Sequence, residues 1–379
     1  MHAANASVSE SISEPDSDPT DAARTTATPD TCHQPLSIAE AELDGGDRVA
    51  WDDFVASHPQ ASLYHGSAWH DVICRSFGHR GYALWATRGQ RCVGVLPLVR
   101  LRSRLFGDYM VSIPFVNYGG ALGEDAAIEQ ALMHVAAKRA RSLGVGHIEF
   151  RDHRSRDTEL AVRTDKVVME LPLDADPEVM RKRFGAKLRS QIKRPLREGA
   201  VARIGHIELL DDFYQVFSRN MRDLGTPVYA RSFFATVLER MADKASVVLI
   251  HLGGRPAAAG LLLTHAGRTE IPWASSLREF NRESVNMLLY DTCIAHACER
   301  GSTIFDFGRS SIDSGTYRFK KQWGAEPLQL HWHYWLADGQ SMPGLTPDNP
   351  KFRLAIAVWQ RLPVSLTNLI GPAIVRNLP

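Results

Sequence analysis

The chain has 379 residues, more than one ordinary hydrophobic core accommodates, so we expect two domains. Its 44% apolar and 23% charged residues are typical of a globular protein and argue against general disorder or a membrane-embedded body. The 44 Lys and Arg residues nearly balance the 43 Asp and Glu residues, and the net charge of +1 gives no overall field that would attract nucleic acid or anionic lipid.

Residues 1–35 are rich in Ser, Thr, Asp, Ala and Pro, and we predict a disordered leader because they bury too little apolar surface. They lack the apolar core of a signal peptide, and no segment has the roughly eighteen apolar residues of a membrane span. The five cysteines are scattered, without the paired spacings of a disulfide framework or a zinc site. We therefore expect a cytoplasmic protein in a reducing compartment.

After the leader, apolar residues at helical spacing predict a helix around Trp51 and another over residues 69–77. Short apolar runs separated by turn residues then predict an antiparallel meander, with strands at 82–87, 92–101 and 109–114. A helix over 126–143 is expected to end at Gly144, and a strand at 147–150 follows it.

The second half repeats this order, with predicted strands at 247–252, 257–265 and 270–274, a helix over 284–300 and a strand at 303–307. Gly144 corresponds to Gly301, and Glu149 corresponds to Asp306 at the same separation. A period this long indicates a duplicated domain, not a stack of small repeats. We predict an α/β (α+β) class with two tandem domains, residues 36–165 and 166–342, each a mixed sheet flanked by helices.

The largest charge anomaly lies between Arg181 and Arg203, where nine basic residues accompany Glu198 as the only acid. Clustered Arg and Lys suit the phosphates of a nucleotide-linked substrate or of a tRNA backbone. A solvated basic face is the alternative interpretation. Pro195 is expected to end or kink the helix. The apolar face of this predicted helix consists of Phe184, Leu188, Ile192 and Leu196.

The tail, residues 343–379, carries apolar residues at helical spacing, interrupted by Pro363 and Pro372, together with four basic residues. An amphipathic segment such as 351–379 can lie in a membrane interface. Packing against the body of the protein is the alternative.

Several short motifs occur in a fixed order along the chain. They are Ser62-Leu63-Tyr64-His65, Ser112-Ile113-Pro114-Phe115, Tyr118-Gly119-Gly120, residues 187–194, residues 225–229, residues 305–310, and Phe319-Lys320. In these motifs and their order the chain resembles the FemAB family, most closely its branch associated with exosortase (PEP-CTERM) and exopolysaccharide systems. The resemblance implies two tandem GNAT-like (acyl-CoA N-acyltransferase-like) domains and transfer of an amino acid from aminoacyl-tRNA to the amine of a cell-wall precursor.

The same resemblance implies a reaction centre around Lys320 in the polar, glycine-bearing segment that follows the last repeated strand. When the acceptor amine attacks the donor carbonyl, an ammonium group there is suited to stabilise the oxyanion, and Asp306 to orient the lysine or to remove a proton. The adjacent Lys321 leaves the choice of lysine open. The expected catalytic residues are Lys320, Asp306, Arg309 and Arg318, and the expected substrate contacts are Lys187, Arg189, Lys193, Tyr229, Trp273, Asn286 and Tyr317.

The predicted function is therefore transfer of an acyl or aminoacyl group onto an amine of a cell-envelope or exopolysaccharide precursor. We expect acyl-CoA or aminoacyl-tRNA as the donor, a nucleotide- or lipid-diphosphate-linked sugar as the acceptor, no tightly bound cofactor, no metal and no DNA partner. Residues 351–379 are a candidate peripheral contact with the inner face of the cytoplasmic membrane. The alternative is a catalytically inactive scaffold that binds anionic lipid or polymer through its basic helix and its tail.

Overall fold

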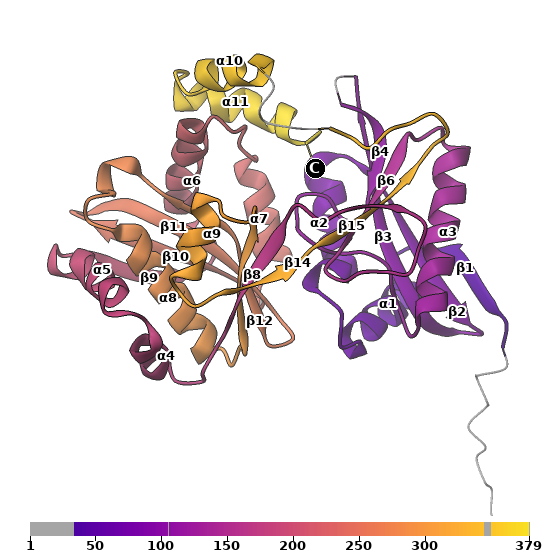
Figure 1. Cartoon of the computed structure of the whole chain (residues 1–379), viewed down its shortest axis with the longest axis horizontal. Coiled ribbons are helices and arrows are strands. Elements are labelled where there is room, and N and C mark those ends of the chain that lie inside the picture. Colours follow the sequence, from indigo (N-terminus) through magenta and orange to yellow (C-terminus); the bar gives the residue numbers. More distant parts are fainter. Residues whose placement is uncertain (1–33, 105, 345–349, 379) are drawn as a thin grey trace, which may run out of the picture. The chain divides into compact units, whose positions relative to one another are not determined.

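The computed structural model describes residues 34–104, 106–344 and 350–378. The predicted leader lies outside the described residues, except for Gln34 and Pro35. The chain from residue 35 onward contains two mixed β-sheets with helices packed against them, as the α/β class predicts (Figure 1).

The first sheet is built on an antiparallel meander followed by a helix and a parallel strand. The predicted strand at 109–114 ends earlier, at Val111, where the chain leaves the sheet as a loop. The elements of this half are β1 (Leu36–Glu40), α1 (Gly45–Ser57), α2 (Ser67–Phe77), β2 (Arg80–Arg88), β3 (Arg91–Ser103), β4 (Gly107–Val111), β5 (Leu122–Gly123), α3 (Ala126–Ser142), β6 (His147–Asp152) and β7 (Ala161–Arg163).

The second sheet repeats this plan, because its central strands and the helix before the parallel strand have the same order and directions. Gly144 and Gly301 both have positive φ, 66° and 74°, just after the equivalent helices, where glycine avoids steric cost. The elements are β8 (Val167–Pro172), α4 (Pro177–Arg183), α5 (Ala186–Arg197), β9 (Val201–Gly205), α6 (Leu210–Leu224), α7 (Arg231–Arg240), β10 (Ala245–Leu252), β11 (Arg255–His265), β12 (Arg268–Ser276), α8 (Val285–Glu299), β13 (Ile304–Ser310), α9 (Gly315–Lys321) and β14 (Glu326–Gln329).

Alternate residues of the second sheet serve two different cores, as the two-residue period of a strand requires. Val248 packs with α8 on one face. Val247 lies on the other face, in a core that includes residues of α6 and α7 and also Trp69 and Val111 of the first half. One continuous hydrophobic core therefore joins the two sheets.

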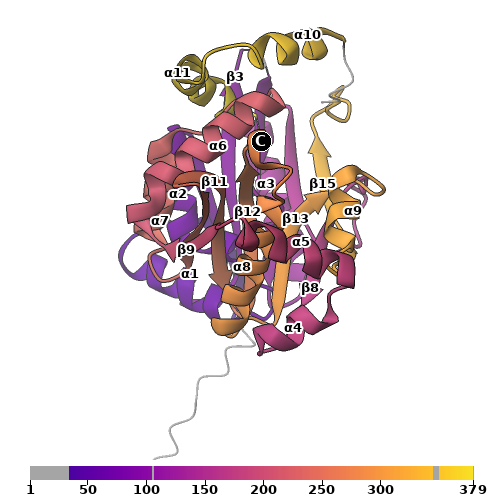
Figure 2. The ribbon, with the colours of Figure 1, turned by 90° about the vertical axis from the view of Figure 1, so that its left-hand side faces the viewer.

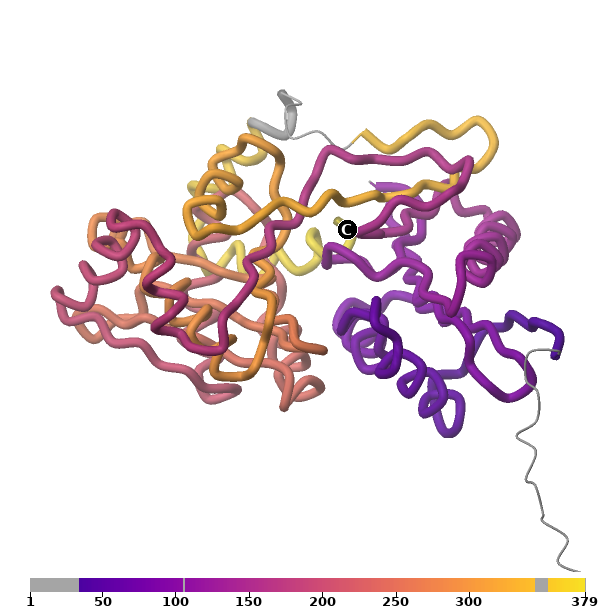
Figure 3. Tube along the Cα trace, turned by 60° about the horizontal axis from the view of Figure 1, so that its bottom comes forward, coloured from indigo at the N-terminus to yellow at the C-terminus, as the bar shows by residue number. Residues whose placement is uncertain are grey.

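Two chain segments cross between the sheets as an antiparallel pair. β14 pairs with β8 in the second sheet, and β15 (His331–Leu336) then inserts between β6 and β7 of the first sheet. At the crossing, the Leu330 amide donates to the Lys166 carbonyl at 3.1 Å. Figure 3 shows the two segments running side by side. β15 thus falls within the range assigned from sequence to the second domain, yet it completes the sheet of the first.

The basic helix α5 differs from its predicted pattern. Leu188 and Ile192 are buried against α8, as expected, whereas Leu196 is 50% exposed. The inward position of the last turn belongs instead to Pro195, which is buried inside the helix, two residues before its end. Phe184 is buried but precedes α5, because it caps the end of α4.

The tail forms two helices, α10 (Pro350–Trp359) and α11 (Val364–Val375), which lie together next to α6 (Figures 1 and 2). Tyr109 donates a hydrogen bond to the carbonyl of Asn377 at 3.0 Å, and Gly371 lies directly against Val228. Packing against the body, one of the two alternatives predicted for the tail, is therefore what the structure shows. Among the described residues, no helix is long and apolar enough to cross a bilayer.

Candidate functional site

Three carboxylates lie side by side on neighbouring strands of the second sheet. Asp306 of β13 is paired with Glu270 of β12 on one side and with Glu170 of β8 on the other. Residues paired in this way point to the same face, so the side chains form a row. Asp306 is fully buried and Glu270 is 4% exposed. Because like charges opposite each other destabilise a sheet, such a row is a candidate for function.

The row is only partly neutralised. Nη1 of Arg268 lies 2.6 Å from Glu170 and 3.4 Å from Asp306. Within the described part of the chain, the ion pairs of this row involve Arg268 alone, so one guanidinium compensates both Glu170 and Asp306. No group of three or more acidic, His or Cys side chains in the described ranges is arranged to hold a metal ion.

Further hydrogen bonds to the row come from the first half of the chain. Tyr118 donates to Oδ2 of Asp306 at 2.7 Å, and Tyr64 donates to Oε2 of Glu270. Asn117 donates to Oε1 of Glu270 at 3.2 Å. Tyr64 stands in the short 3-10 turn Leu63–His65, whereas Asn117 and Tyr118 belong to the loop after β4. The site is thus assembled from both repeats.

The loop after β4 is held in an unfavourable backbone conformation. Ile113 and Phe115 have φ of 60° and 71°, which is rare and costly for residues with a Cβ atom. Packing fixes the loop, because Trp332 donates to the carbonyl of Asn117 at 3.1 Å. The loop meets the second sheet where β12 and β13 stop pairing, beyond Glu270. Strain at such a junction is common at functional sites.

Burial and mutual repulsion shift the proton affinity of the row. Burial and the neighbouring Asp306 raise the pKa of Glu270 to about 8. Burial also raises the pKa of Asp306, against the opposing effect of Arg268. Glu270 is therefore a carboxyl group that can take up and release a proton near neutral pH.

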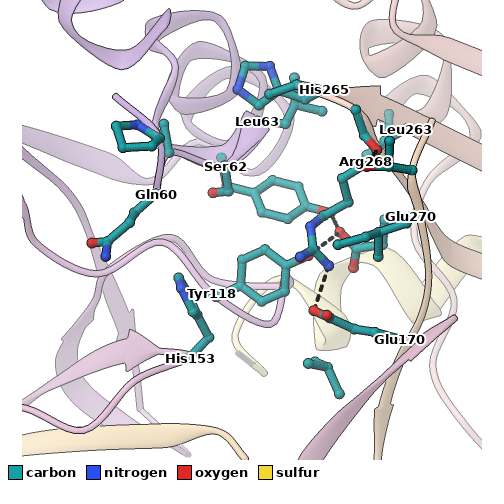
Figure 4. Close-up of a pocket in the computed structure, with 18 residues that line it drawn as sticks. Gln60, Ser62, Leu63, Tyr118, His153, Glu170, Leu263, His265, Arg268 and Glu270 are labelled. Carbon is teal, nitrogen blue, oxygen red and sulfur yellow. Dashed lines mark hydrogen bonds and ion pairs between the residues drawn. The ribbon is translucent and has the colours of Figure 1, made fainter. Parts of the chain in front are cut away.

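Glu270 lines a cavity of about 240 Å³ between the two halves. Figure 4 shows the Arg268 guanidinium at its wall, next to Tyr118, Glu170 and Glu270. The cavity is therefore polar and acidic on one side. Its other walls include Gln60, Ser62, His153 and His265.

Lys320 and Asp306, predicted from sequence, both bind the bulge of β13 between Asp306 and Arg309, where the strand makes a local turn at Gly308, whose φ is 77°. Nζ of Lys320 donates to the carbonyls of Gly308 and Arg309 at 2.9 and 3.0 Å, while the Gly308 amide donates to Asp306 at 2.7 Å. Burial lowers the pKa of Lys320 to about 8. Lys321 is exposed and bonded to Glu326, so Lys320 is the inward lysine. Among the described residues that line the cavity, neither Lys320 nor Asp306 appears.

The other predicted catalytic residues stand apart from the cavity. The Arg309 guanidinium lies 4.8 Å from the ring centroid of Trp332, which Arg151 also contacts, at 4.4 Å. Burial of this guanidinium lowers the pKa of Arg309. Arg318 is exposed and donates to the carbonyl of Asp313 at 2.7 Å.

The predicted substrate contacts are also dispersed. Tyr229 and Trp273 pack edge to face in the core shared by the two sheets, while Asn286 and Tyr317 are half-buried. None of the seven is among the described residues that line the cavity. Their roles stay predictions. On α5, the exposed members of the set are Lys187, Arg189 and Lys193.

Sequence reasoning missed most of the cavity wall. From the sequence, Glu270 is only the first residue of a predicted strand, although an acid at the start of an apolar strand is a usable signal. Tyr64 and Tyr118 stand out only as motif residues. No local pattern indicates that these three side chains meet.

Known proteins share the fold at low sequence identity. A crystal structure of FemX is 14% identical, with a TM-score of 0.58, over 78% of this chain and 96% of that chain. A tandem GNAT protein from the clavulanic acid biosynthesis pathway is 13% identical, with a TM-score of 0.51, over 82% and 100% of the two chains. The C-terminal domain of an Agrobacterium fabrum protein described as a lysylphosphatidylglycerol synthetase is 15% identical, with a TM-score of 0.52, over 75% and 91%.

No curated protein matches the chain. Residues 182–321 match the family model described as an acetyltransferase (GNAT) domain. That range contains α5, the whole of β10 to β13 and Lys320. The chain therefore has the predicted tandem GNAT-like fold, and the model match lies within its second half.

Proposed function

We propose that the protein is an N-acyl or aminoacyl transferase in which the acceptor amine reacts in the cavity beside Glu270. The observation that carries the proposal is the wall of that cavity. It holds a buried carboxyl group whose pKa is raised to about 8 by burial and by a second carboxylate. A group with this proton affinity suits deprotonation of an ammonium ion near neutral pH.

In the proposed reaction the acceptor arrives as an ammonium ion, attracted by the carboxylates of the cavity wall. Ionised Glu270 accepts one proton, and the freed nitrogen lone pair forms a bond to the donor carbonyl carbon. When the tetrahedral intermediate collapses, the bond from this carbon to the sulfur or oxygen of the leaving group breaks. The proton held by Glu270 then neutralises the leaving group, and the second proton that the nitrogen loses on forming the amide passes to solvent.

The surrounding side chains position the base. Tyr64 and Asn117 donate to the two oxygens of Glu270, which fixes the orientation of the carboxylate. Lys320 is a positioning residue in this proposal, because its ammonium holds the turn whose Gly308 amide binds Asp306. Stabilisation of the oxyanion by Lys320, as the family resemblance implies, requires the ammonium to reach the donor carbonyl when substrates bind.

The donor we propose is acyl-CoA or aminoacyl-tRNA. In support, residues 182–321 match a GNAT acetyltransferase model, and the similar tandem GNAT protein is described with reference to AcCoA. The exposed basic residues Lys187, Arg189 and Lys193 suit the phosphates of either donor, or those of a nucleotide- or lipid-diphosphate-linked sugar acceptor. The exopolysaccharide assignment of that acceptor depends on sequence resemblance alone.

Transfer assays on paired variants test the proposal. Purified protein is incubated with acyl-CoA or aminoacyl-tRNA donors and amino-sugar acceptors. Mass spectrometry then measures the increase in acceptor mass that a transferred group would cause. We expect Glu270→Gln to abolish transfer, and Glu299→Gln, at an exposed position of α8, to retain it. Unchanged turnover by Glu270→Gln would remove this residue as the base. Absence of transfer by the unaltered protein with every donor would favour the inactive scaffold.

A further inference from the structure

The two tail helices expose large apolar side chains although both pack on the body. Leu354 and Val358 of α10 are 70% and 52% exposed. Leu366 and Leu369 of α11 are 39% and 77% exposed. Within each helix the two residues are one turn apart, so each pair forms a stripe on one side. Stripes of this kind call for a specific explanation.

The stripe of α11 is directed away from the protein. Thr367, Gly371 and Val375 are buried, and a Cβ atom on Gly371 would lie 2.9 Å from the backbone nitrogen of Val228. This face contacts the body. Leu369 is two residues from both Thr367 and Gly371, about 200° around the helix, and therefore lies on the opposite side.

The stripe of α10 is also directed outward. Ile356 packs so closely against Gly225 that a Cβ atom on this glycine would lie 2.5 Å from Cγ2 of the isoleucine. Leu354 and Val358 each stand two residues from Ile356, on the opposite side of the helix.

Both helices lie on the same support. The end of α6 binds the segment between them, because Arg222 donates to the carbonyl of Leu362 at 3.0 Å and Gln360 donates to the carbonyl of Asp223 at 3.1 Å. Figures 1 and 2 show α10 and α11 together at this end of α6. The two outward stripes therefore point away from one platform.

The charge of the tail indicates what covers these stripes. Residues 343–379 contain Lys351, Arg353, Arg361 and Arg376 and one acid, Asp348, in a chain whose total charges nearly balance. Basic and apolar residues together suit the interface of a bilayer with anionic headgroups. A symmetric contact between two copies would instead bring two basic surfaces together.

We propose that the outward faces of α10 and α11 form a membrane-docking surface for anionic lipid, with Leu354, Val358, Leu366 and Leu369 inserted at the acyl boundary. The surface is independent of the chemistry at Glu270. It places the protein at a bilayer without a spanning helix.

Vesicle co-sedimentation of the full chain tests this surface. The probes are vesicles of phosphatidylcholine alone and vesicles of an equimolar mixture of phosphatidylglycerol and phosphatidylcholine. We expect binding to the mixed vesicles, weakened by added salt. Each of Leu354→Glu and Leu369→Glu should lower the partition coefficient by about tenfold, because an inserted leucine is replaced by a charge.

The matched control is Val49→Glu, a change of the same kind at a residue that is 59% exposed in the first half. It should leave vesicle binding unchanged, and all three variants should keep the thermal midpoint of the unaltered chain. Equal binding to both vesicle types, or unchanged binding by the leucine variants, would overturn the proposal. So would a dimer in solution that Leu369→Glu converts to monomer while vesicles bind neither form.

Discussion

The two repeats carry a buried acid at the same position, but the side chains that surround this acid differ between them. Glu149 of β6 corresponds to Asp306 of β13, and each pairs with the parallel strand that precedes it. In the first repeat the paired residue is Val111; in the second it is Glu270. Burial acts to raise the pKa of the Glu149 carboxyl, but the Arg151 guanidinium, at 2.6 Å, opposes this effect. The net result is that the pKa of Glu149 lies below its ordinary value.

The two acids thus differ in their partners, because Glu149 is compensated by Arg151 whereas Asp306 faces a second carboxyl group. Glu149, satisfied by Arg151 and by a hydrogen bond from Tyr334, stays ionised and stabilises the sheet. Asp306 faces Glu270, and two carboxylates this close repel each other, so the two groups resist being ionised at the same time. The same fold therefore holds a charge-compensated acid in one repeat and two facing carboxyl groups in the other, and the difference lies in the charged side chains next to each acid.

The sharpest test of the comparison is Glu270→Gln. Loss of a general base should lower turnover by about 10²- to 10⁴-fold. Stability should not fall, because the substitution relieves a buried like-charge pair. Turnover measurements and thermal unfolding of the same preparation check both parts. A large loss of stability would show that Glu270 is a structural acid, as we infer for Glu149 of the first repeat.

The opposite result is expected for Glu149→Gln. This change leaves the buried Arg151 without its carboxylate, and loss of one partner of a buried pair costs about 3–5 kcal/mol. Urea unfolding measures the cost. Turnover per folded molecule should stay the same, and a specific loss of turnover without destabilisation would break the comparison.

A smaller effect on stability is expected for Lys320→Ala. The carbonyls of Gly308 and Arg309 lose their donor, which costs about 1–3 kcal/mol. We also expect transfer to be lost, because Asp306 depends on this turn. The control is Lys321→Ala, which removes only an exposed ion pair. If turnover of the Lys320 variant matches that of the control, Lys320 takes no part in the reaction.

A pH dependence of stability is also expected. The ordinary pKa of a glutamate is 4.5, and below this pH Glu270 is protonated in both the folded and the unfolded chain. Between pH 4.5 and about pH 8 it is ionised in the unfolded chain but stays protonated in the folded one. The free energy of unfolding should therefore fall with rising pH across this window and level off above it. Urea titrations should show a weaker slope for Glu270→Gln. An identical slope would mean that Glu270 ionises normally in the folded protein.

Much of the fold could be predicted because apolar periodicity and turn residues specify elements locally. The two meanders, the crossover helices and the caps at Gly144 and Gly301 are of this kind. The placement of β15 could not be predicted, because an apolar strand pattern does not state which sheet receives the strand. The buried residue of the last turn of α5 is Pro195 and not the predicted Leu196. The sequence does not decide between them, because residues on one face of a helix can be separated by either three or four positions.

The candidate site was only partly accessible from sequence. Asp306 and Lys320 stand in one glycine-bearing segment, and the structure brings them to the same turn. Glu270 becomes significant only through strand register, and Tyr64 and Tyr118 only through packing of a turn and a loop from the other repeat. Contacts between residues this far apart in the chain leave no periodic signal.

The exchange of β15 into the first sheet makes the two repeats inseparable. A fragment ending before β8 would expose the edge of β6, and the complementary fragment would carry β15 without a sheet to receive it. Unpaired edges of this kind promote aggregation. We therefore expect neither repeat to be expressed as an autonomous domain and the whole chain to denature in a single cooperative transition, so that any ancestral one-domain form has become unrecoverable by simple truncation.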